Sequence, residues 1–145
     1  MANKYDIYFQ PVAEGEVRSF KCFEFGYASA LKVRGPQALV NRWVKVFMTP
    51  KGSDPLYPAE GTAFGNLPGS NITRISDDLQ DMVSIAMDDA SNQVREQDVA
   101  GLYDADEQLQ SAELLRFETV ADGIAVWIII KNMAEESLAV QAAVI

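Results

Sequence analysis

The sequence contains no histidine and only one cysteine, Cys22, among its 145 residues. Without histidine, Ser-His-Asp and Cys-His catalytic arrangements are excluded, and the commonest protein ligand for metals is missing. A single cysteine excludes a disulfide within the chain and fits a reducing compartment. Because Cys22 lies in a segment typical of a strand, we interpret it as an inert thiol. We therefore expect no catalytic residue, no cofactor and no metal site.

Positive charge is also scarce, because 12 basic residues face 21 acidic ones and the net charge is −9. Such acidity argues against a nucleic-acid partner, which requires clustered positive charge. The distribution is uneven: residues 25–53 hold five basic residues and no acidic one, which leaves −14 for the rest of the chain. The basic part of this stretch, residues 32–51 with Arg42 and Lys45, is predicted to be a partner surface, or else a solvated helix face.

Long apolar runs are absent. The strongest, "GIAVWIII", is too short to cross a bilayer as a helix, and "MANKYDIYFQ" has no apolar stretch of signal-peptide length. Hydrophobic residues nevertheless make up 48% of the chain, enough for a core without disulfides or metals. The sequence predicts a soluble domain made in a cytoplasm, with no membrane partner.

Two segments have helical periodicity. An apolar stripe in residues 36–48 predicts a first helix, with Pro36 in its first turn and with Pro50 and Gly52 ending it. A second stripe predicts a longer helix, capped by Ser70 or Asn71 and reaching about Gln93.

Between these helices, residues 50–69 contain four of the nine glycines and four of the six prolines. The segment includes "GTAFGN" but lacks the lysine and hydroxyl of a P-loop and the spacing of GxGxxG. Prolines restrict the backbone and glycines permit sharp reversals. The segment is therefore predicted to be a shaped connector and not a phosphate site.

Strand signals dominate the last third of the chain. Residues 114–120 and 123–132 flank a turn at Asp122 and Gly123, which predicts a hairpin, and residues 137–145 form a candidate third strand. Residues 5–10 and 18–33 suggest short strands or an extended arm. The predicted fold class is α+β, with two main helices joined by a Pro/Gly-rich connector and packed on a small antiparallel sheet. We divide the chain into an arm, residues 1–29, and a domain, residues 30–145.

Carboxylates are plentiful. "DADEQLQSAELL" resembles the start of a calcium loop, but Leu109 and Leu115 occupy the sixth and twelfth positions, where glycine and glutamate are required. Calcium binding is therefore rejected. Paired carboxylates could also hydrolyse glycosides, so a peptidoglycan-degrading glycosidase is kept as an alternative function.

The order of the predicted elements carries a resemblance. Between the helices the chain fits the spacing T-x-x-G-x-x-x-x-x-P-x-x-G-T-x-[LF] at Thr49, Gly52, Pro58, Gly61, Thr62 and Phe64. This pattern, from about Ala30 to the C-terminus, resembles the small baseplate wedge proteins of contractile phage tails, a family that includes a baseplate component of type VI secretion systems.

The resemblance implies a structural, non-enzymatic virion protein of the tail baseplate, near the tube, that initiates sheath assembly by strand exchange. Its implied partners are other wedge proteins, the tail sheath subunit, and tail tube or hub proteins. Another tail or head-completion protein is a further alternative.

The family often carries Glu-Pro-Arg just after the long helix, a motif that helps to dock the protein onto the wedge. Here the matching triplet is Gln93-Val94-Arg95, so only the arginine is kept. Arg95 is predicted to dock another wedge protein, or else to steady the C-terminal end of its own helix. The strand "SLAVQAAVI" has no charged side chain to block pairing with a partner, although it could equally complete its own sheet. The predicted partner-binding residues are Arg95, Gln93, Leu138, Val140, Ala142, Val144, Arg42 and Lys45.

Overall fold

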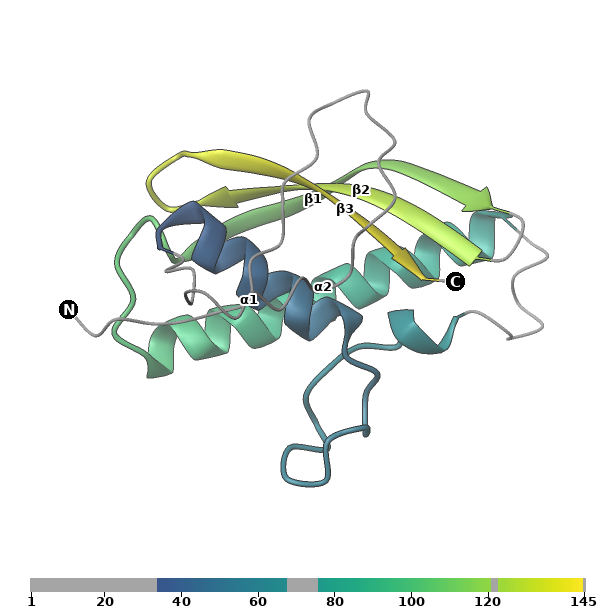
Figure 1. Cartoon of the computed structure of the whole chain (residues 1–145), viewed down its shortest axis with the longest axis horizontal. Helices are drawn as coiled ribbons and strands as arrows, with labels where there is room; N and C mark the ends of the chain where they lie inside the picture. Colours follow the sequence, from purple (N-terminus) through teal and green to yellow (C-terminus); the bar gives the residue numbers. More distant parts are fainter. Residues whose placement is uncertain (1–33, 68–75, 121–122, 145) are drawn as a thin grey trace, which may run out of the picture.

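A computed structural model describes residues 34–67, 76–120 and 123–144. Its elements are α1 (Pro36–Met48), the short 3-10 helix η1 (Phe64–Asn66), α2 (Ser76–Ala100), β1 (Leu109–Val120), β2 (Gly123–Asn132) and β3 (Ser137–Val144). The strands form an antiparallel sheet in the order β1-β2-β3. Figure 1 shows both α-helices below one face of this sheet, which confirms the α+β class.

Helix α1 forms where the apolar stripe predicts it. Pro36 stands at its first position, where a missing N–H costs nothing, and Thr49 ends it in an extended conformation. The backbone N–H and the Oγ1 hydroxyl of Thr49 both donate to the Lys45 carbonyl, at 3.1 Å and 2.6 Å. On the buried face, the rings of Trp43 and Phe47 stack with centroids 4.9 Å apart. Trp43 Nε1 also donates a hydrogen bond of 3.0 Å to Ser91 Oγ on α2, which joins the two helices.

Helix α2 is longer than predicted, because it continues past Gln93 to Ala100 and spans 25 residues. No proline or glycine lies between Ser76 and Ala100, and the buried stripe that includes Val83 and Ala90 continues to Val94, past Gln93. The predicted start at Ser70 or Asn71 lies outside the described residues, as do the predicted N-terminal strands and arm.

The sheet buries one face against the helices. The hairpin is confirmed by the pairing of Val120 with Gly123 across two intervening residues, and β1 begins earlier than predicted, at Leu109. Along β2, alternate residues point toward the helices and are almost fully buried: Ile124, Val126, Ile128 and Ile130. The core therefore lies between this face and the two helices.

Candidate partner-binding surfaces

Strand β3 lies at one edge of the sheet. It pairs with β2 in an uninterrupted register, and no other described strand pairs with its second edge. The side chains of Val140 and Ala142 are only 4% and 2% exposed, because they face the helices, and Leu138 packs against the same core. The strand therefore completes its own sheet, one of the two roles expected for it, while pairing of its second edge with a partner stays a prediction. For Val144 the structure describes the backbone pairing with Ile124. What β3 offers to a partner is therefore its backbone edge.

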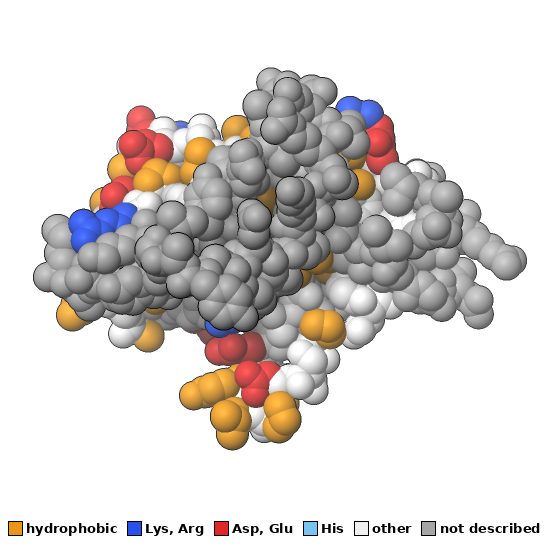
Figure 2. Space-filling view, in the orientation of Figure 1, with side chains coloured by type: hydrophobic (Ala, Val, Ile, Leu, Met, Phe, Trp, Pro, Cys, Tyr) orange, Lys and Arg blue, Asp and Glu red, His pale blue; other side chains and the backbone are white. Residues whose placement is uncertain are grey.

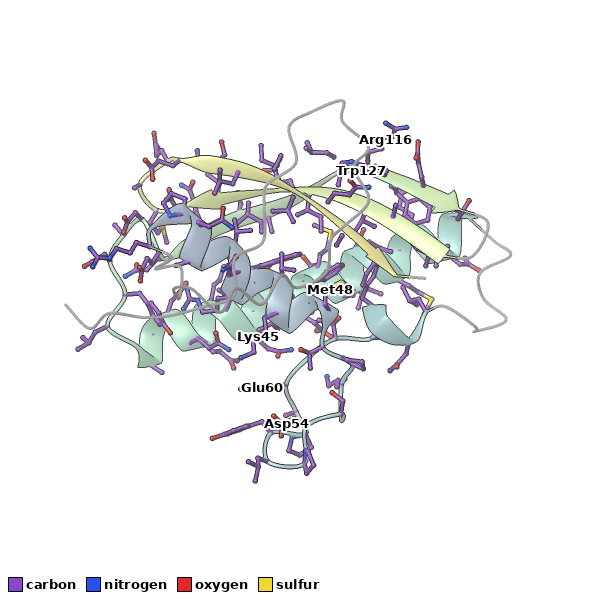
Figure 3. All side chains as sticks on the ribbon, viewed as in Figure 1. Lys45, Met48, Asp54, Glu60, Arg116 and Trp127 are labelled. Carbon is purple, nitrogen blue, oxygen red and sulfur yellow. The ribbon has the colours of Figure 1, made fainter. Side chains whose placement is uncertain are left out.

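The outer face of the sheet, which points away from the helices, carries charged, polar and aromatic side chains, unlike the apolar face toward the helices. Arg116 lies over the ring of Trp127, 4.9 Å from its centroid, and forms an ion pair with Glu118. Figure 3 shows Arg116 and Trp127 together on the side of the sheet away from the helices. Gln141 pairs in register with Trp127, and its Oε1 atom is buried without a hydrogen-bond partner.

Arg42 is used inside its own chain. Its Nη2 atom lies 2.6 Å from Asp98 Oδ1 and donates to the Glu107 carbonyl at 2.6 Å, while the guanidinium covers the Tyr103 ring at 3.9 Å. The two paired side chains are only 14% and 11% exposed. This network ties α1 to the end of α2 and to the loop that follows, and it leaves little of the Arg42 side chain accessible to a partner. Lys45 remains exposed on α1.

Gln93 also has an internal role. Its Nε2 atom donates to the Gly61 carbonyl at 2.8 Å, and its Oε1 atom accepts from the Gly61 N–H at 2.9 Å. The amide thus pairs with both polar groups of one backbone residue, between α2 and the segment after α1. Gln93 thus has a structural role within its own chain, and its predicted contact with a partner stays a prediction.

Arg95, two residues further along α2, is exposed. It donates to the Gln110 carbonyl at 3.1 Å and makes a longer contact of 3.4 Å with Asn92 Oδ1. The triplet 93–95 lies within α2, whereas the resemblance places it just after the long helix. Arg95 is therefore not in the last helical turn, and the alternative that it steadies the helix C-terminus is wrong.

Residues 49–67 are here called the connector loop; Figure 1 shows its middle part projecting away from the sheet, while its end, η1, returns to the body of the domain. Its stem, residues 49–51 and 61–64, is closed by backbone hydrogen bonds from Thr62 to Thr49 (2.9 Å) and from Lys51 to Thr62 (3.0 Å). Gly61 has φ +96°, and a Cβ there would lie 2.3 Å from the Thr49 carbonyl oxygen. Phe64 is fully buried and stacks on Phe47 with centroids 4.2 Å apart.

Two residues of the spacing pattern, Thr62 and Gly52, are explained by contacts and backbone geometry within the connector loop. Thr62 Oγ1 donates to the Phe47 carbonyl at 2.6 Å and accepts from the Phe64 N–H at 3.2 Å. Gly52 has φ +83°, which a turn at this place requires. These residues shape the connector loop and close its stem.

Unlike the stem, the tip of the connector loop, residues 54–60, carries large apolar side chains that are exposed. Asp54 Oδ1 accepts from the backbone N–H groups of Leu56 (2.8 Å) and Tyr57 (3.4 Å), which forms an Asx turn. The Glu60 N–H donates to the Tyr57 carbonyl at 3.0 Å and forms a second turn. Leu56 is 83% exposed and Tyr57 59% exposed. Sequence reasoning missed this feature, although two large apolar residues between Pro55 and Pro58 were its signal.

Comparisons of the chain with protein-family models, with curated proteins and with solved structures gave no match. Within residues 34–67, 76–120 and 123–144, no group of three His, Cys, Asp or Glu side chains could hold a metal ion. Across the same ranges, no helix combines the length and hydropathy needed to span a bilayer.

Proposed function

We propose that this chain is a structural protein of a contractile phage tail baseplate, a wedge protein near the tube that initiates sheath assembly by strand pairing. The observation that carries the proposal is β3, an edge strand without charge or proline that pairs with β2 on one side. Edge strands are usually protected by lysine, proline or a bulge, and β3 has none of these in its register with β2.

The burial of β3 side chains supports a pairing role for its backbone. Because Val140 and Ala142 anchor the strand in the core, its backbone is already extended before a partner arrives. An added strand then gains main-chain hydrogen bonds without a deep pocket, and little conformational entropy is lost on the side of this chain.

Two further surfaces belong to the proposal. Arg95 is exposed, and its guanidinium has N–H groups beyond those that contact Asn92 and Gln110, so it can dock a wedge protein through charge-assisted hydrogen bonds. Lys45 is a second exposed basic contact on α1. The Pro/Gly-rich connector would fix one path between the helices and so hold these surfaces in a constant relation.

The test is electron microscopy of phage particles assembled without this protein. We expect baseplates that lack sheath, and restoration of sheathed tails when the wild-type chain is supplied in trans. Normal sheathed tails without the protein would contradict the proposal. Clear lysis of peptidoglycan in a zymogram, lost when one carboxylate is changed, would favour the glycosidase instead.

A matched pair of variants tests the strand-pairing step. Successive backbone N–H groups of a strand point to opposite edges, so Ala142→Pro and Ala143→Pro each remove a hydrogen-bond donor from a different side of β3. The variant whose proline removes a hydrogen bond to β2 should melt at a lower temperature than the wild-type chain. The variant whose proline removes a donor from the opposite edge of β3 should keep the wild-type melting temperature and lose sheath attachment. Normal sheath attachment by this second, folded variant would count against strand pairing.

A further inference from the structure

We infer that the tip of the connector loop is a docking element that inserts Leu56 and Tyr57 into an apolar pocket, bordered by basic side chains, on a neighbouring baseplate protein. This inference rests on the proposed function and adds a contact separate from β3. Its basis is the combination of exposure, local order and charge at residues 54–60.

The exposure at the tip is concentrated in a short stretch. Pro55, Leu56, Tyr57 and Pro58 are consecutive and all exposed. Scattered apolar residues are ordinary on protein surfaces, but contiguous apolar groups on a projecting segment mark interaction sites. Figure 2 shows orange side chains gathered at the end of the projecting loop, with red carboxylates beside them.

The tip is also held in shape before any contact. The Asp54 carboxylate fixes the backbone at Leu56 and Tyr57, the Glu60 turn closes the other side, and two prolines restrict the chain between them. The stem is in turn joined to α2 through the paired amide of Gln93. Because this order is already present, docking would cost little conformational entropy, which is the property of an effective binding anchor.

Shape and charge define the partner. A convex tip with adjacent leucine and tyrosine side chains fits a concave apolar site, and tyrosine is among the residues that dominate binding energy in protein interfaces. Residues 54–60 carry two carboxylates, Asp54 and Glu60, and no basic side chain. Figure 3 places both acidic residues on this loop, so a complementary rim is basic. The same carboxylates disfavour insertion into an anionic lipid surface.

The experiment measures competitive incorporation into particles. Cells infected with the phage produce the wild-type chain together with the double variant Leu56→Ser and Tyr57→Ser, and mass spectrometry gives the ratio of the two in purified tails. Loss of a binding anchor is expected to reduce the share of the variant roughly 30-fold relative to its cellular level. The matched control is Ile85→Ser, which removes an apolar side chain that is 61% exposed on α2 and should leave the ratio unchanged.

Each outcome decides the inference. A tail ratio equal to the cellular ratio for the double variant overturns the docking role while the proposed function stands, and absence of the wild-type chain from tails overturns both. Flotation of the wild-type chain, but not the double variant, with phosphatidylglycerol vesicles would assign the tip to a membrane and also overturn the inference. Unchanged melting temperature of the double variant ensures that a reduced ratio reports docking, and Glu60→Lys should also lower the ratio if the rim is basic.

Discussion

In the stem of the connector loop, Gly61, Thr62 and Phe64 are buried, whereas in the tip Leu56 and Tyr57 are 83% and 59% exposed. Both parts combine glycine or proline with a large apolar residue, yet one joins the core and the other projects from it. The difference comes from polar contacts. Thr62 and Gly61 direct Phe64 inward, while Asp54 orders a turn that has no core beside it.

This contrast shows that a turn-rich composition does not reveal which residues serve folding and which are free for a partner. Substitutions in the stem should change the free energy of unfolding, and substitutions in the tip should leave it almost unchanged.

Phe64→Ala should have the largest effect. The side chain is fully buried and stacks on Phe47, so its removal leaves a cavity between α1 and the connector loop. We expect the free energy of unfolding to fall by about 3–5 kcal/mol, measured by urea denaturation. The control is Leu56→Ala in the tip, which should change it by less than about 0.5 kcal/mol. Similar losses for both variants would remove the distinction between stem and tip.

Gly61→Ala and Gly52→Ala distinguish the cost of a strained backbone conformation from the cost of a steric clash. Both glycines have positive φ, but a Cβ at Gly61 would lie 2.3 Å from the Thr49 carbonyl oxygen, while a Cβ at Gly52 meets nothing within 4 Å. Gly52→Ala should cost about 1–2 kcal/mol for the left-handed conformation alone. Gly61→Ala should cost at least about 2 kcal/mol, since the stem must also open. Thermal and urea unfolding of the two proteins provide the comparison, and equal costs would mean that the stem yields without penalty.

Gln93→Ala should destabilise the stem through hydrogen bonding. The change leaves the buried N–H and carbonyl groups of Gly61 without the Gln93 amide, which costs about 1–3 kcal/mol of unfolding free energy. Arg95→Ala is the matched control on the same helix, because its contacts are exposed and its loss should cost less than about 0.5 kcal/mol. A larger effect at Arg95 than at Gln93 would reverse the roles assigned to these two residues.

These residues also show how far the sequence could be interpreted. Periodicity predicted α1, the hairpin and β3 because the signals are local: apolar spacing, Pro36 at a helix start, and a short turn before Gly123. The continuation of α2 was missed because residues 95–98 are all polar, and the next apolar residue after Val94, Val99, is 89% exposed and does not extend the buried stripe.

The roles of individual polar residues depended on contacts distant in sequence. Arg42 meets Asp98, and Gln93 meets Gly61, at separations of 56 and 32 residues. Nothing in the neighbouring sequence distinguishes such an engaged side chain from an exposed one. For the same reason, the uncharged sequence of β3 was compatible both with pairing to a partner and with its own sheet, and it did not show that Leu138, Val140 and Ala142 pack toward the helices.

Asp54→Ala should have the smallest effect on stability and a local effect on order. Among the described residues the carboxylate accepts hydrogen bonds only from the tip, so its loss should change the free energy of unfolding by less than about 0.5 kcal/mol. The amide hydrogens of Leu56 and Tyr57 should nevertheless exchange faster, since the side-chain acceptor that protects them is gone. Asp54→Asn, which keeps an acceptor oxygen at the same place, should preserve most of the protection. If exchange at the two amides is unchanged in Asp54→Ala, the two prolines alone hold the tip in shape, and the order available for docking comes from covalent restriction and not from the Asx turn.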